Sequence, residues 1–244
     1  MKFTYNGYEE LLNLLDENGY KIADYHTWKE FDKCVVLRHD VDTDLQKALE
    51  MAELEYQRGI KSTYFVLVTS NFYNLHSCRN RQIVNEIQNL GHTVGLHFDE
   101  MSTPEDIGNV GKVIEHIENE IKVLTEILNT SITAFSYHRP SKTILDADIM
   151  IQGVVNAYGN LFFKQFKYMS DSRMHWREPV LNIIREGKYQ QLHILTHPLW
   201  YHNEEKTMKE ILYEFLSRAS MEKYDNLKDN FTNLSDVINW REFE

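Results

Sequence analysis

Two patterns of hydrophobic and polar positions alternate along this chain. Helical spacing comes first: Tyr8, Leu11 and Leu15 are three and four positions apart, and Gly19 follows where a helix would end. A run of strand length comes next, an apolar and β-branched stretch that starts at Cys34 and ends in charged residues. The chain is therefore expected to open with an amphipathic helix followed by a strand.

The same alternation continues along the sequence. We expect further helices over residues 45–56, 83–90, 102–128, 179–188 and 204–240, and further strands over residues 60–68, 92–99, 131–140, 153–159, 161–169 and 190–197. Strands that alternate with helices indicate repeated βα units and a mainly parallel sheet or barrel. No stretch rich in Gly, Ser or Pro divides the sequence, so we expect a single domain over residues 1–244.

Composition and charge narrow the possible partners. The chain is 42% hydrophobic and 26% charged, which is typical of one globular domain. Its net charge of −11 provides no general basic field for phosphate backbones, so we expect no nucleic-acid partner. Cys34 and Cys78 are far apart in sequence, and no long apolar run occurs. We therefore expect a cytoplasmic protein without a membrane span.

Ionisable side chains gather at the carboxyl ends of the expected strands. They are Asp40 and Asp42, His97, His138 and Arg139, Asp171, and His197. Because the carboxyl ends of parallel strands meet at one face, we expect these side chains to lie together. A single Asp or His of this kind is explained equally well by a helix cap or a structural hydrogen bond. Burying so many charged groups without partners is costly, so their coincidence favours a functional site.

Five sequence motifs carry a family resemblance. They are, in order, "LRHDVD", "GHTVGLHFDE", "YHRP", "SDSRMHW" and "LHILTHP". Together they resemble the polysaccharide deacetylase family, the NodB-homology group of carbohydrate esterases, over a core at about 35–202. The resemblance implies an α/β fold, namely a distorted (β/α)7 barrel, with an extra N-terminal helix and a helical C-terminal tail. It also implies a carbohydrate substrate that loses an acetyl group, and a divalent metal ion, zinc by preference, with nickel or cobalt as alternatives.

The resemblance assigns proton-transfer roles to four residues. Asp40 matches the general base, and Arg139 matches the arginine that orients it. His197 matches the general acid, and Asp171 matches the carboxylate that holds this histidine. Hydrolysis of an amide needs a base for the attacking water and an acid for the leaving amine, so these residue types suit the reaction.

Three aromatic residues are expected to contact the substrate. Trp176 matches an aromatic side chain that lines the acyl-binding groove of the family. Tyr137 and Trp200 flank the proposed acids, where we expect them to stack on a sugar ring.

The metal site is where the sequence departs from the family. Asp42 and His97 match two ligands, but the usual second histidine is replaced by Met101, whose thioether is a poor ligand for such cations. His138 is our preferred third ligand because it ends a neighbouring strand. Asp99 or Glu100, in the loop after His97, is an alternative, and weak or absent metal binding is another.

Three functions follow from these alternatives. The preferred one is a metal-dependent deacetylase of an N-acylated sugar, similar to enzymes associated with surface polysaccharide synthesis. A carbohydrate-binding pseudo-enzyme of the same fold is the second. The third takes "DVDTD" as the nucleophile loop of a haloacid dehalogenase-type phosphatase, but Asp44 stands where that motif has Thr or Val.

Overall fold

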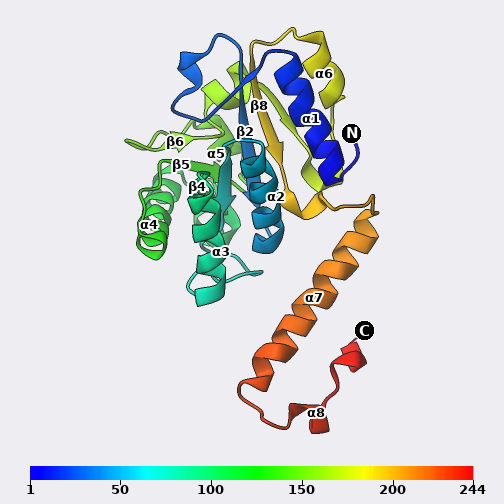
Figure 1. Ribbon diagram of the computed structural model, residues 1–244. Helices are drawn as coiled ribbons and strands as arrows, with labels where there is room; N and C mark the ends of the chain where they lie inside the picture. Colours follow the sequence, from blue (N-terminus) through cyan, green and yellow to red (C-terminus); the bar gives the residue numbers. More distant parts are fainter. Residues whose placement is uncertain (244) are drawn as a thin grey trace. The chain divides into compact units, whose positions relative to one another are not determined.

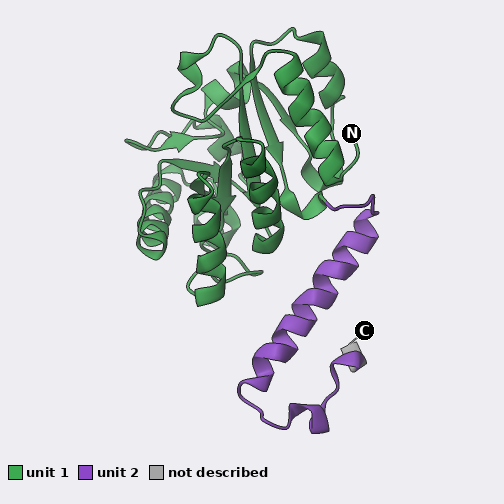
Figure 2. Cartoon of the chain, in the orientation of Figure 1, with its two compact units in different colours: residues 1–201 green, residues 202–244 purple. Residues whose placement is uncertain are grey.

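The chain divides into two compact units. In the computed structural model, which describes residues 1–243, residues 1–201 form the first unit and the residues from His202 onward form the second (Figure 2). The core expected at about 35–202 lies in the first unit except for its last residue. The division into two compact units does not test whether the chain is one domain, so the single domain expected over residues 1–244 stays a prediction.

A sheet of parallel strands forms the centre of the first unit. Its strands are β1 (Lys21–Ala23), β2 (Cys34–Val41), β3 (Thr63–Val66), β4 (Thr93–Phe98), β5 (Ala134–Tyr137), β6 (Val155–Asn156), β7 (Lys167–Ser170) and β8 (Gln191–Thr196). The strands lie in the order β6-β5-β4-β3-β2-β8-β7, and β1 pairs with the start of β2. Among residues 1–243 the two end strands, β6 and β7, do not pair, so the barrel is open between them. The predicted α/β class, with its seven-strand parallel path, is confirmed.

Helices flank this sheet (Figure 1). They are α1 (Tyr5–Glu17), α2 (Leu45–Gln57), α3 (Cys78–Asn89), α4 (Val110–Leu128), α5 (Lys142–Asp146) and α6 (Val180–Glu186). Helix α1, the predicted N-terminal helix, packs beside α6, and α3 packs against both α2 and α4. Short 3-10 segments follow three strands: η2 (Glu100–Ser102), η5 (Ser172–Met174) and η6 (Pro198–Trp200). They follow β4, β7 and β8, the strands whose carboxyl ends carry His97, Asp171 and His197.

Strand β2 shows how alternation places that site. Successive side chains of a strand point to opposite faces of the sheet. Val35 and Val41 lie on one face, where they are buried in hydrophobic clusters together with side chains of the flanking helices. Arg38, Asp40 and Asp42 lie on the opposite, inner face, so one strand brings a cation and two carboxylates to the same place.

Helix α4 begins later than the sequence predicted. The segment expected to start the helix forms only a 3-10 turn, Pro104–Asp106. Gly108 then adopts a φ of 76°, a conformation that a right-handed helix cannot continue through. Asn109 caps the new start, because its side chain accepts a hydrogen bond from the Lys112 amide at 3.2 Å.

The strand expected over residues 161–169 is mostly something else. Leu161–Gln165 forms one π-helical turn, and β7 begins only at Lys167. Phe162 and Phe166 are buried in a hydrophobic cluster with Val36 and Phe65. The hydrophobic side chains of this segment therefore pack in the core without forming a strand. The strand expected over residues 153–159 is likewise reduced to β6.

The second unit is helical, as the tail was predicted to be. It contains α7 (Met208–Lys228), α8 (Leu234–Val237) and a final 3-10 turn, Trp240–Phe243. Thr207 and Glu210 form a capping box that begins α7. Within residues 1–243, no helix is both long enough and apolar enough to cross a membrane.

Candidate active site

Three potential metal ligands meet at the carboxyl end of the sheet. Asp42 follows β2, His97 lies near the end of β4, and His138 follows β5. Asp42 Oδ1 lies 3.1 Å from His97 Nε2 and 3.1 Å from His138 Nδ1, and the three ligand atoms lie within 4.8 Å of one another. Two imidazole nitrogens and one carboxylate oxygen are a donor set that suits a catalytic zinc ion. The residues present therefore fit a divalent metal ion.

The surroundings of these ligands prepare them for a cation. Burial alone would raise the pKa of Asp42, but hydrogen bonds to His138 and His97 and the charge of His197 hold it well below its usual range. His97 Nδ1 lies 2.6 Å from Ser136 Oγ. With a proton on Nδ1 donated to Ser136, His97 would keep the lone pair of Nε2 for a bound cation, as a ligand histidine requires.

The alternatives to His138 are engaged elsewhere. Asp99 pairs with Arg139, and Glu100 accepts hydrogen bonds from the amide of Gly108 and the hydroxyl of Ser141. Met101 lies beyond the end of β4 in η2 and is 46% exposed. Of the candidates that the sequence left open, His138 is the one that the structure brings to Asp42 and His97.

Asp40, the expected base, is held by an arginine of its own strand. Arg38 Nε and Nη2 donate to the two carboxylate oxygens of Asp40 at 2.9 and 2.7 Å. Burial alone would raise the pKa of Asp40, but the adjacent Arg38 and the more distant His97 lower it. Asp40 Oδ2 lies 3.6 Å from His97 Nε2, so the base stands at the edge of the metal-ligand group.

Arg139 does not make its expected contact. We expected it to orient Asp40, but its guanidinium pairs with Asp99 and its side chain is 57% exposed. The physical reason is that β5 ends at Tyr137, so Arg139 lies beyond the strand. Arg38 occupies a regular strand position on the same face as Asp40, and it makes the contact with Asp40 that was expected of Arg139.

The expected acid forms a tight pair. His197 follows β8, and its Nδ1 lies 2.6 Å from Asp171 Oδ1. Asp171 is fully buried and also accepts from the His197 amide at 3.0 Å and from the Tyr201 hydroxyl at 3.0 Å. Burial alone would lower the pKa of His197, but Asp171, Asp42 and Asp40 raise it to about 9. Its other nitrogen, Nε2, lies 3.8 Å from Asp42 Oδ2 and faces the ligands.

The predicted aromatic contacts have different outcomes. Tyr137 is only 1% exposed and packs with Phe135 in the cluster under the helices, so it cannot stack on a sugar as we expected. Strand alternation is the reason, because Ser136 and His138 take the inner face and Tyr137 the outer one. Trp176 and Trp200 are partly buried in the loops after β7 and β8, and their contact with a substrate stays a prediction.

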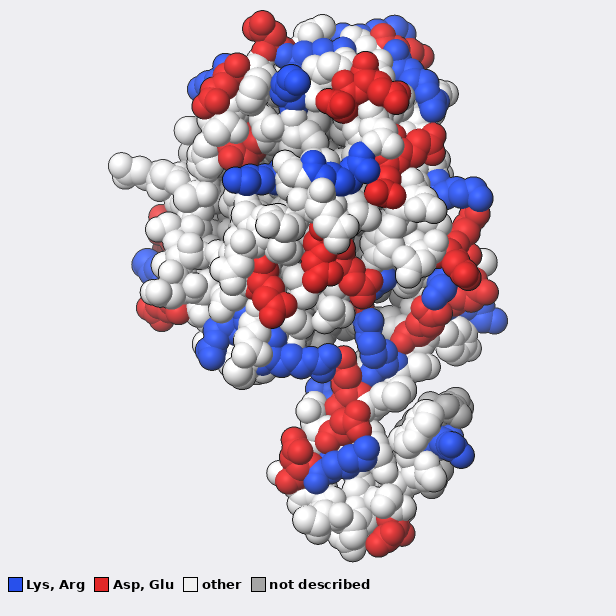
Figure 3. Space-filling model, in the orientation of Figure 1, with Lys and Arg blue, Asp and Glu red and all other residues white. Residues whose placement is uncertain are grey.

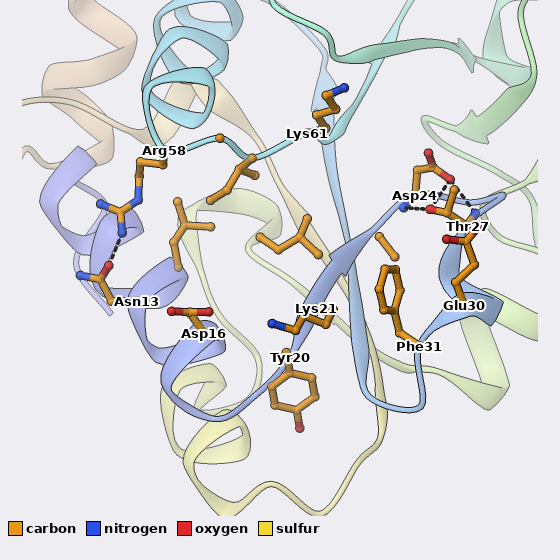
Figure 4. A pocket seen from close by; sticks show the side chains of 15 residues that line it. Asn13, Asp16, Tyr20, Lys21, Asp24, Thr27, Glu30, Phe31, Arg58 and Lys61 are labelled. Atoms are coloured by element: carbon orange, nitrogen blue, oxygen red, sulfur yellow. Dashed lines mark hydrogen bonds between the residues drawn. The ribbon is translucent and has the colours of Figure 1, made fainter.

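A cavity lies away from these residues. It measures about 800 Å³ and is bordered by α1, β1 and the segment Gly59–Lys61 before β3 (Figure 4). Lys21 and Asp16 are among the residues that line it, and Arg58 donates a hydrogen bond to the side-chain oxygen of Asn13 (Figure 4). None of the predicted site residues lines it.

Surface charge is mixed. Lys and Arg are interspersed with Asp and Glu on the face shown in Figure 3, and the chain as a whole has a net charge of −11. The absence of a nucleic-acid partner stays a prediction.

Comparison with known proteins finds similar solved structures. No protein-family model matches the chain, and no curated protein matches it. The matching solved structures include a carbohydrate esterase family 4 pseudoenzyme from Bacillus anthracis at 13% identity, covering 78% of this chain and 62% of that one, with a TM-score of 0.45. A polysaccharide deacetylase from Bacillus cereus matches at 15% identity, covering 72% and 93%, with a TM-score of 0.44. The chitin deacetylase of Colletotrichum lindemuthianum matches at 14% identity, covering 76% and 81%, with a TM-score of 0.46.

These solved structures come from the family that the motifs resemble. This chain spans less than two thirds of the length of the Bacillus anthracis protein. The TM-scores lie below 0.5, so the likeness assigns no activity to this chain.

The sequence motifs assign no specific role to two residues of this site, Arg38 and Ser136. In both cases the signal was available, since residues two positions apart in a strand share a face. Arg38 shares a face with Asp40, and Ser136 shares one with His138.

Proposed function

We propose that this protein is a metal-dependent hydrolase that removes an acyl group, acetyl by preference, from an N-acylated sugar. One observation carries the proposal: the group formed by Asp42, His97 and His138 is flanked by a carboxylate, Asp40, and by a histidine, His197. A ligand group, a base and an acid within reach of one another are the set that metal-assisted amide hydrolysis requires.

The ligand group leaves room for chemistry. Two histidines and one carboxylate suit zinc, nickel or cobalt, and three protein ligands leave a position for water or substrate. The bound ion would polarise the acyl carbonyl and lower the pKa of a water molecule. Zinc is our first choice, with nickel and cobalt as alternatives.

The remaining residues move protons. Asp40, kept ionised by Arg38, accepts the proton of the attacking water. His197, kept protonated by Asp171, donates a proton to the leaving nitrogen through Nε2, the atom that faces Asp42. An amine leaves poorly without a proton, and the raised pKa of His197 keeps this proton on the imidazole at neutral pH.

The proposal extends to the role of the protein in the cell. We assign it to surface polysaccharide synthesis in the cytoplasm. The motif resemblance supports the first part. The two widely separated cysteines, one buried and one exposed and neither in a disulfide, support the second.

Metal content and acetate release test the proposal together. Purified protein is loaded with zinc, nickel or cobalt, its metal content is measured by mass spectrometry, and acetate release is followed on N-acetylglucosamine oligomers and other N-acetylated sugars. We expect one bound ion per chain and measurable release. Asp42→Ala and His138→Ala should lose both, whereas His197→Gln should lose release and keep the metal. The exposed His26 provides a control, because His26→Ala should keep both.

Met101 stands where the family has a second ligand histidine, and this favours a second candidate, a carbohydrate-binding protein of this fold that lacks metal chemistry. Protein that binds none of the three metals after loading, and yet binds N-acetylated oligosaccharides by calorimetry, would contradict the hydrolase and support the binding protein.

A further inference from the structure

Arg38 lies in an unusual place for a charged side chain. It is 0% exposed and lies on the inner face of β2, in the interior of the sheet. Its guanidinium carbon lies 4.4 Å from the ring centre of Tyr158 and 5.2 Å from that of Phe65. These rings favour a cation by their electron-rich faces, and they also restrict its movement. The arginine is therefore enclosed and fixed, not a mobile surface charge.

The contact between Arg38 and Asp40 is a two-point contact. Nε faces one carboxylate oxygen and Nη2 the other, so the planar guanidinium fixes both the position and the rotation of the carboxylate. A lysine in the same place could offer one point charge and would not fix the rotation. The geometry is that of an orienting residue.

The position of Asp40 makes this orientation consequential. Its Oδ2 lies 3.6 Å from Nε2 of His97, the nitrogen that faces Asp42. A carboxylate this close to a ligand nitrogen can rotate and become a further ligand of the ion, and the positive charge of the ion would then lower its basicity. Arg38 engages both oxygens of Asp40 and opposes that rotation.

We propose that Arg38 is the positioning residue that keeps Asp40 available as a base and out of the metal's ligand shell. The inference rests on the proposed function for its catalytic part, but the ligand shell can be observed without turnover. Arg139 has no share in this role, because it pairs with Asp99 at the exposed edge of the site. Two arginines, one enclosed and one exposed, provide a matched comparison.

Cobalt provides the decisive readout. Cobalt-loaded wild type, Arg38→Met, Arg38→Lys and Arg139→Met are compared by their visible absorption spectra, which respond to the number of ligands. We expect Arg38→Met to bind cobalt and to show a spectrum of higher coordination, because Asp40 joins the ion. Arg38→Lys should fall between the two, and Arg139→Met should match the wild type.

A second variant shows whether the effect passes through Asp40 and guards against misfolding. Arg38→Met leaves a buried carboxylate unpaired, so its fold is checked by circular dichroism beside Arg38→Met/Asp40→Asn, which removes both charges. The double variant should have the spectrum of Asp40→Asn alone. A spectral change from Arg38→Met that persists in the Asp40→Asn background would overturn the proposal.

Kinetics add the catalytic part. If an N-acetylated sugar is turned over, Arg38→Met should lower kcat by about 100-fold, within the range expected for a lost general base, with KM changed little. Arg38→Lys should recover part of the loss. Wild-type kcat and an unchanged cobalt spectrum in Arg38→Met would refute the role of Arg38, as would a larger loss in Arg139→Met. If the wild type turns over no acylated sugar, the proposed function fails, and the cobalt spectra still decide the role of Arg38.

Discussion

The protonation of His197 can be predicted most sharply, and Asp171→Asn perturbs it most directly. Asp171 is fully buried and accepts from His197 Nδ1 at 2.6 Å. The asparagine keeps the size of the side chain and removes its charge. We expect the pKa of His197 to fall from about 9 to 6.5 or below. Burial lowers this pKa, and the charge of Asp171 that offsets the effect of burial is then absent.

The structure gives the size of this effect. A pKa raised from 6.5 to about 9 corresponds to about 3 kcal/mol of preference for the charged imidazole, at 1.36 kcal/mol per pH unit. The folded-state pKa lies above the unfolded one. The stabilisation is therefore fully present below about pH 6.5 and is lost as the pH rises through about 9.

Nuclear magnetic resonance measures this pKa without any substrate. Metal-free protein, prepared with a chelator, is titrated while the ring protons of His197 are followed. His197→Gln identifies the resonance. Denaturant unfolding from pH 6 to pH 10 tests the same linkage, because wild type should lose about 3 kcal/mol of stability to His197 titration that His197→Gln does not lose.

Asp16→Asn, on the exposed face of α1, serves as the charge-matched control and should leave the titration of His197 unchanged. The reasoning is refuted if His197 in the wild type titrates near pH 6.5. It is equally refuted if Asp171→Asn leaves its pKa near 9 in a folded protein.

Three further substitutions test the stability of the fold. Burial, and to a lesser extent the nearby charge of Asp99, raises the pKa of Glu120 to about 8, so ionisation destabilises the folded state as the pH rises from about 4.5 through 8. Glu120→Gln should therefore gain about 2 kcal/mol in denaturant unfolding at pH 7.5 and little at pH 4.5, and an equal gain at both would contradict this. Gly95→Ala should lose about 1–3 kcal/mol in the same assay, because the new Cβ would lie 2.5 Å from the Phe65 ring, and an unchanged midpoint would disprove the close packing. Asp44→Ala should lose about 1 kcal/mol by removing the cap of α2, whereas Asp44→Ser should retain most of it.

Periodicity predicted most of the helices and strands because it reflects which face each element buries. The helix from Tyr8 to Leu15 is an example, since it buries one consistent face. The strand from Cys34 was indicated by a continuous apolar run, since β2 is buried on both faces. It failed where local backbone conformation decided the outcome, as at Gly108 before α4. It also failed where hydrophobic side chains fill the interior without forming a strand, as at Phe162.

The sequence alone determined which residues reach the carboxyl end of the sheet. Asp40, Asp42, His97, Asp171 and His197 lie at strand ends, and in a parallel sheet those ends share an edge whatever the details of packing. Their proximity follows from the order of strands and helices, so it could be predicted without coordinates.

Only the tertiary structure decided how these residues are paired. It selected His138 over Asp99 and Glu100 beside Asp42, and Arg38 over Arg139 beside Asp40. The physical reason is that a contact depends on where each strand ends and on its register with strands far away in sequence. A residue inside a strand has a fixed face. Two residues past the end of a strand, as at Arg139 after β5, the direction of the side chain is set by the loop and its neighbours.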